Sequence, residues 1–139
     1  MQRSVNTLTA ILVVLGWWRS FAAYPLLPRR IPIHFNILGR PDGWGARWMV
    51  WLLPLLTSIM AILWLAGLVG RHNIRLTPAS SLPSSLLLLV VVGGLLYINE
   101  RIVDCAKGEA EGLGLVFLPV FLLLASGLSI WLSMTGAGK

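Results

Sequence analysis

The chain has 139 residues, of which 57% are hydrophobic and only 12% are charged, and its mean hydropathy is +0.82. A water-soluble domain usually carries about 25% charged residues, so this composition excludes an ordinary soluble domain and favours lipid as the main solvent. Lysine and arginine number 11 against 5 acidic residues, but they sit at the ends of apolar runs, as basic flanks of membrane spans do. The lipid bilayer is therefore a predicted partner, and nucleic acid is not.

Four apolar segments are long enough to cross a hydrocarbon core of about 30 Å, which takes roughly 20 helical residues. Backbone groups in lipid must be satisfied within each segment, so the spans should be helices. The sequence predicts an all-α integral membrane protein with a single membrane domain, residues 1–139. The expected helices cover residues 5–26, 48–69, 82–103 and 113–133, and residues 27–47 are expected to form an extended, turn-rich cap between the first two.

The first span has a second interpretation. Arg3, the apolar stretch after it and the sequence Ser20-Phe21-Ala22 resemble a cleavable secretory signal. However, Trp17, Trp18 and Arg19 interrupt the approach to that cleavage site, and the apolar run resumes beyond it. We expect the first helix to be retained.

Polarity alternates along the first part of the cap. Ile31 and Ile33 fall on one side of an extended chain, with His34 and Asn36 on the other. Prolines at 28 and 32 favour extended backbone for their predecessors. The pattern predicts a short extended segment whose apolar face presses on the helices, while His34 and Asn36 point away.

The sequence RPDGWG, residues 40–45, predicts a turn in the second part of the cap. Pro41 presets one backbone angle, Asp42 can bond its own backbone, and Gly43 can adopt a positive φ. Such a turn would fold Trp44 back towards the helices, and Gly45 would lead into the second span. The predicted structural residues of the cap are Pro28, Pro32, Gly39, Pro41, Gly43, Trp44 and Gly45.

The motif of the cap consists of Tyr24-Pro25, Leu27-Pro28, Arg30-Ile31-Pro32, His34-Phe35-Asn36, Gly39 and Pro41-Asp42-Gly43-Trp44-Gly45. With these residues the chain resembles the bacterial membrane domain-of-unknown-function family numbered sixteen forty-eight, which also forms the front part of SdpI-type immunity proteins. The resemblance covers roughly the first half of the chain. The family pattern often has an acid at the position of Arg29 and a small polar residue at that of Ile33, so this sequence departs from it at both places.

Two indicators of orientation disagree. With four spans, four basic residues fall on the side of the N-terminus and six on the side of the cap, which favours a cytoplasmic cap. The resemblance implies instead that the cap lies outside the cytoplasmic membrane of a bacterium. Following the resemblance, we expect a multi-pass protein of the inner membrane with a cytoplasmic N-terminus.

His34, Asn36, Asp42, Arg30 and Arg19 are the candidate binding residues. We expect His34 and Asn36 to hydrogen-bond backbone groups of the cap, and Asp42 to serve its own turn or pair with Arg40 or Arg47. A zinc site needs three or four protein ligands, and the second histidine, His72, falls on the other side of the membrane, so no metal site is predicted. Arg19 is the costliest residue within a span, and we expect it to snorkel or to pair with the cap. Glu100 is expected to be a solvated helix end or to contact Arg29, Arg30 or Arg47.

The sequence has no nucleophile elbow, phosphate loop or paired carboxylates on a span, so neither an enzyme nor a cofactor is predicted. The first functional hypothesis is a non-enzymatic membrane protein whose cap recognises a peptide or a membrane-protein partner, as the resemblance to immunity proteins implies. The second is a small accessory subunit of a larger membrane complex, with apolar helix faces left exposed. The third is a transporter or a small-ligand- or metal-binding protein, with a polar cavity lined by Arg19 and Asn99.

Overall fold

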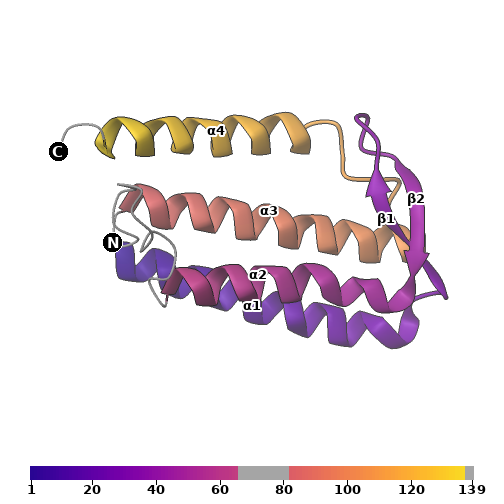
Figure 1. The fold of residues 1–139 in the computed structure, drawn as a ribbon. Coiled ribbons are helices and arrows are strands. Elements are labelled where there is room, and N and C mark those ends of the chain that lie inside the picture. The colour runs from indigo at the N-terminus through magenta and orange to yellow at the C-terminus, as the bar shows by residue number, and fades with distance from the viewer. Residues whose placement is uncertain (66–81, 137–139) are drawn as a thin grey trace.

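The computed structural model of the chain describes residues 1–65 and 82–136. In this part of the chain, helices α1 (Gln2–Ala23), α2 (Leu52–Leu65), α3 (Leu82–Lys107) and α4 (Phe117–Gly136) lie roughly antiparallel, as Figure 1 shows. Strands β1 (Arg30–Phe35) and β2 (Pro41–Ala46) form a hairpin across one end of the bundle. Short 3-10 helices, η1 (Tyr24–Leu26) and η2 (Arg47–Trp51), join the hairpin to α1 and α2.

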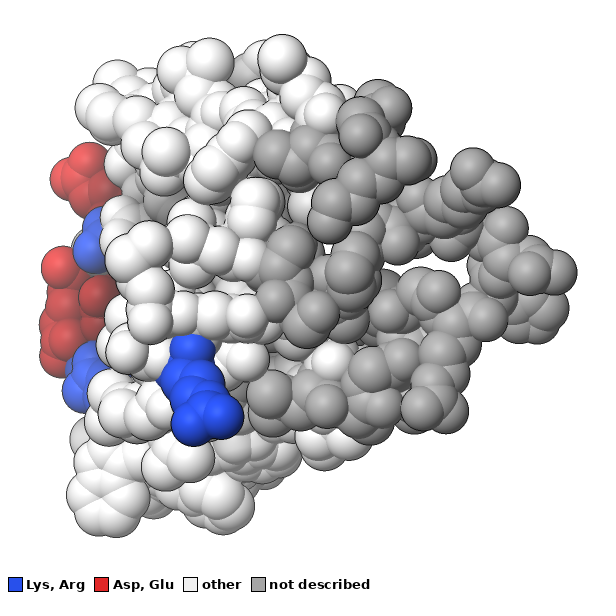
Figure 2. Space-filling view, turned by 90° about the vertical axis from the view of Figure 1, so that its left-hand side faces the viewer, with Lys and Arg blue, Asp and Glu red and all other residues white. Residues whose placement is uncertain are grey.

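Four helical segments in the described residues are long and apolar enough to cross a membrane: Gln2–Leu26, Arg47–Trp64, Leu82–Lys107 and Phe117–Met134. This confirms the predicted four-span organisation, typical of a multi-pass membrane protein. Figure 2 views the bundle from the end that holds the N-terminus. There the described surface is almost entirely uncharged, apart from one basic side chain in front and charges along one edge.

The helix boundaries differ from the predicted ones where glycines and charges decide them. α3 continues past residue 103 to Lys107 and ends in a Schellman motif, in which the N–H of Glu109 donates to the carbonyl of Asp104 (2.8 Å). Gly108, with φ of 77°, supplies the left-handed residue that this motif needs. α4 begins at Phe117 and not at 113. The predicted end of the second span, residue 69, lies outside the described residues.

α3 is the central helix, because it packs against α1, α2, α4 and β1. One apolar cluster in its middle centres on Leu88, Val92 and Leu96. The other cluster joins its last turns to the hairpin end of the bundle and contains Ala23, Leu27, Ile31, Val50, Ile102 and Val103. The hairpin is thus part of the core at that end.

The segment predicted to be extended is strand β1, but it is half of an antiparallel hairpin, which was not predicted. β1 pairs with β2 from Arg30 opposite Ala46 to Phe35 opposite Pro41. Pro41 starts β2, where a residue without an N–H is tolerated. The residues predicted as a tight turn, 40–45, are therefore mostly strand.

Candidate functional site

The turn of the hairpin is made by Asn36 and Gly39, ahead of the predicted position. The Oδ1 atom of Asn36 accepts hydrogen bonds from the backbone N–H groups of Leu38 and Arg40, both at 3.0 Å. Gly39 has a φ of 73°, whereas Gly43 is not among the glycines with positive φ in the described residues. An Asn side chain that bonds its own turn, followed by a left-handed glycine, forms the turn here. The sequence Pro41-Asp42-Gly43, which also favours a turn, lies in β2 instead. The prediction that Asn36 fixes backbone groups is confirmed.

Gly43 and Gly45 serve close packing. A Cβ atom on Gly43 would lie 2.8 Å from Cβ of His34 on the paired strand. A Cβ atom on Gly45 would lie 2.8 Å from Cδ1 of Ile33. These glycines let β1 and β2 approach each other, and neither makes the turn that the sequence suggested.

The predicted alternation of buried residues along the first part of the cap holds only in part. Ile31 is fully buried and Phe35 packs against the buried cluster, but Ile33 is 42% and Ile37 91% exposed. The register shifts on both sides of His34, and such bulges turn the following side chains. Pro32 is buried, whereas Trp44, predicted to fold back onto the helices, is 51% exposed.

His34 and Asp42 face each other across the two strands. Nδ1 of His34 lies 2.5 Å from Oδ1 of Asp42, and the side chains are 72% and 43% exposed. This corrects two expectations, since His34 contacts a carboxylate and no backbone group, and Asp42 pairs with neither Arg40 nor Arg47. The guanidinium of Arg47 instead lies 4.7 Å from the centre of the Tyr24 ring.

A metal site would need a third ligand beside His34 and Asp42. No group of three His, Cys, Asp or Glu residues gathers in the part of the chain that the structure describes. His72 lies outside the described residues. The pair is therefore a surface-exposed, charge-assisted contact between the strands.

Arg19 and Arg30 do not come together with this pair. Arg30 is exposed at the first position of β1. The guanidinium of Arg19 contacts the carboxylate of Glu100 on α3 through Nη2 at 2.7 Å and through Nε at 2.9 and 3.0 Å. Arg19 thus pairs with a neighbouring helix and not with the cap, and Glu100 contacts none of the three arginines considered for it.

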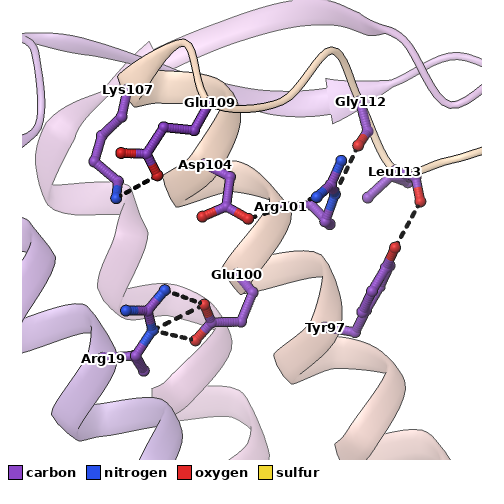
Figure 3. Close-up of polar contacts among 9 residues, drawn as sticks. All are labelled: Arg19, Tyr97, Glu100, Arg101, Asp104, Lys107, Glu109, Gly112 and Leu113. Atoms are coloured by element: carbon purple, nitrogen blue, oxygen red, sulfur yellow. Dashed lines mark hydrogen bonds and ion pairs between the residues drawn. The ribbon is translucent and has the colours of Figure 1, made fainter.

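Arg19–Glu100 belongs to a row of ion pairs along the last turns of α3, which Figure 3 shows. Arg101 lies 3.5 Å from Asp104, and Lys107 lies 2.7 Å from Glu109. We call these six residues the charged row. It places most of the acidic groups of the chain beside the hairpin, at one end of the bundle.

The hairpin is also held by the loop between α3 and α4, residues 108–116, which sequence reasoning missed. The N–H of Leu113 donates to the carbonyl of Gly39 (2.8 Å), and the carbonyl of Leu113 accepts from the hydroxyl of Tyr97 (2.9 Å). Nε of Arg101 donates to the carbonyl of Gly112 (2.8 Å). Gly112 touches the backbone of Gly39 so closely that a Cβ atom there would collide with its carbonyl oxygen. No local pattern in the sequence links this loop to the hairpin.

The interior near Arg19 is polar but closely packed. Asn99 is 1% exposed, and its Nδ2 donates to Oγ of the buried Ser20 (2.9 Å), while its Oδ1 has no partner. Arg19 points instead to the outer ion pair. The two residues thus lie in different surroundings: Asn99 is buried against Ser20, and Arg19 is partly exposed beside Glu100. A polar cavity lined by both residues, expected for a transporter, stays a prediction.

Comparison with known proteins identifies the first part of the chain. Residues 11–57 match the family model described as "Domain of unknown function (DUF1648)". A protein of Archaeoglobus fulgidus described as "Uncharacterized protein" is 33% identical over 57 residues, which is 41% of this chain and 31% of that relative's own length. No solved structure matches the chain. The resemblance of the cap motif is thereby confirmed for residues 11–57, which run from the middle of α1 through the hairpin into α2.

Proposed function

We propose that this chain is a non-enzymatic multi-pass membrane protein whose hairpin is a docking surface for a peptide or a membrane-protein partner. The observation that carries the proposal is a hairpin whose inner side is held by the helix bundle and whose outer side is exposed. Ile31 anchors it in the core, and Gly39 ties its turn to Leu113. A surface that is already ordered loses little conformational entropy when a partner binds.

The outer side of the hairpin offers both polar and apolar contacts. The His34–Asp42 pair and Trp44 are exposed there, and Ile37 at the turn is 91% exposed. Each strand has one sheet neighbour in the described residues, so backbone groups along the outer edges are available to an extended peptide. Aromatic residues such as Trp44 are favoured anchors of binding surfaces.

We place the protein in the cytoplasmic (inner) membrane of a bacterium, with the N-terminus in the cytoplasm and the hairpin outside. An SdpI-like role in immunity or signalling would fit that arrangement, because a peptide toxin or signal would meet the hairpin from outside the cell. The family of residues 11–57 and the exposed hairpin support this proposal.

An accessory subunit of a larger membrane complex is the second candidate. It is favoured by α4, of which no residue in the central part of its span is buried inside the protein. Leu122, Leu123 and Ile130 are at least 60% exposed and could lie against another subunit as well as against lipid.

Affinity purification in mild detergent, with mass spectrometry of the co-purifying proteins, tests these proposals. We would compare wild type with a His34→Ala, Trp44→Ala double variant, because both side chains are exposed and their loss leaves the turn of Asn36 intact. Trp18→Ala is the matched control, since Trp18 is 69% exposed but lies on α1.

A stoichiometric partner that is lost in the double variant and retained in Trp18→Ala supports docking on the hairpin. A partner retained in both variants contradicts hairpin docking and supports the accessory-subunit candidate. If wild-type protein brings no partner from cells that express it at its normal level, both candidates are wrong.

A further inference from the structure

Two neighbouring cavities lie at the side of the bundle, and their linings differ in polarity. The larger is an apolar groove of about 740 Å³ between α1, α3 and α4, next to the loop of residues 114–116. The smaller, of about 430 Å³, lies beside the hairpin turn and is lined by Arg40, Arg101 and Glu111 together with small and apolar residues. Gly114 and Leu115 line both cavities, so the polar pocket and the apolar groove adjoin at this loop.

The depth of the groove matches one leaflet of a bilayer. Along α3 its lining runs from Tyr97, near the hairpin end, to Leu89, which is about 12 Å at 1.5 Å per residue. Half of a hydrocarbon core is about 15 Å thick. An acyl chain that entered from the hairpin end would therefore lie along Gly93 and Val120 and end near the middle of the membrane.

Two of the three charged side chains of the polar pocket have no partner among the described residues. Arg40 and Glu111 are both exposed, and neither side chain has a hydrogen-bond or ion-pair partner among the described residues. Arg101 is partly satisfied by Gly112 and Asp104. The pocket thus presents a guanidinium and a carboxylate that are both exposed and that no described residue pairs. Guanidinium groups bind phosphate in a bidentate manner, and carboxylates accept hydrogen bonds from ammonium groups.

We propose that the two cavities together form a binding site for a phospholipid with a phosphoethanolamine headgroup. The phosphate lies against Arg40, with Arg101 beside it, and the ammonium group lies against Glu111. One acyl chain fills the groove between α3 and α4. The charge pattern selects this zwitterionic headgroup, because an anionic glycerol headgroup would leave Glu111 unpaired next to a negative lipid.

Native mass spectrometry of the purified full chain in detergent, titrated with phosphatidylethanolamine and phosphatidylglycerol of identical acyl chains, tests the proposal. Wild type should bind one phosphatidylethanolamine roughly tenfold more tightly than phosphatidylglycerol, a difference of about 1.4 kcal/mol. Arg40→Gln should weaken both lipids by about tenfold or more, and Glu111→Gln should remove the preference between them. Arg29→Gln, an exposed arginine outside the pocket, makes the same change in charge and should bind as wild type does.

A second variant tests the groove separately from the headgroup pocket. A Cβ atom on Gly93 has no heavy atom within 4 Å, so Gly93→Leu should place its side chain in the groove without a collision in the core. It should weaken both lipids equally and leave the melting temperature of the lipid-free protein unchanged.

Three results would overturn the proposal. The first is equal lipid binding by wild type and Arg40→Gln, and the second is unchanged binding by Gly93→Leu. The third is displacement of the lipid by inorganic phosphate or free phosphoethanolamine at the concentration of the lipid itself, which would make a soluble phosphate compound the ligand.

Discussion

The spans of α3 and α4 are similarly apolar, yet the two helices occupy opposite positions in the structure. In an apolar stretch of 18 residues in each span, 39% of the residues are buried inside the protein in α3 and none in α4. α3 lies between the other helices and carries the charged row, whereas α4 lies against α3 at the edge of the bundle (Figure 1). Hydropathy therefore identifies both as spans but does not tell which is the centre.

The difference between the two helices has a physical cause. Helices in lipid gain little from hiding apolar surface, so they associate through close packing and hydrogen bonds. α3 offers the features that allow both: Asn99 bonds to Ser20 of α1, and Gly94 leaves room for the ring of Phe121 of α4. The serines at 126 and 129 of α4 bond to carbonyls of their own helix.

The largest expected effect comes from the same substitution made on the two helices. Leu88 on α3 is 6% exposed, and Leu123 on α4 is 72% exposed. Leu88→Ala should reduce the free energy of unfolding by about 1–3 kcal/mol, less than in a water-soluble core, because the reference solvent is lipid. Leu123→Ala should change it by less than about 0.5 kcal/mol. Equal effects in denaturation of the detergent-solubilised protein would remove the distinction between a central and a peripheral helix.

Two adjacent glycines of α3 test how closely α3 and α4 pack against each other. A Cβ atom on Gly94 would collide with the ring of Phe121, whereas one on Gly93 meets nothing within 4 Å. Gly94→Ala should lower the free energy of unfolding by about 1–2 kcal/mol because α4 must move away. Gly93→Ala should leave it unchanged or raise it by up to about 1 kcal/mol through its helix propensity. Thermal melting of both variants gives the answer, and a stable Gly94→Ala protein would contradict the packing of α4.

The charged row should contribute least, although it is the most conspicuous polar feature of α3. The side chains of Arg19 and Glu100 are 49% and 34% exposed, so the coupling between them should be about 0–1 kcal/mol. A double-mutant cycle with Arg19→Gln, Glu100→Gln and the combined variant measures it. A coupling of about 3 kcal/mol or more would mean that the pair lies within the hydrocarbon.

The sequence alone predicted the features that depend on residues close together in the chain. Apolar length predicted four spans, and the cap motif predicted the family model that residues 11–57 match. Each of these follows from the composition or spacing of neighbouring residues. Of the candidate site, the exposure of His34 and the hydrogen bonds of Asn36 to backbone groups were predicted in the same way.

The remaining features depend on contacts between residues far apart in the chain. The hairpin formed because Asn36 and Gly39 made a turn ahead of the PDG sequence, and its position was fixed by Leu113, which no local pattern linked to it. Arg19 had several carboxylates within reach of its helix end, and only the packing of α1 on α3 selected Glu100. The sequence determined that the chain has four helical segments apolar enough to cross a membrane and which family model residues 11–57 match, because those depend on local chemistry. The tertiary structure decided which helix is central and which charges pair, because those depend on where the helices meet.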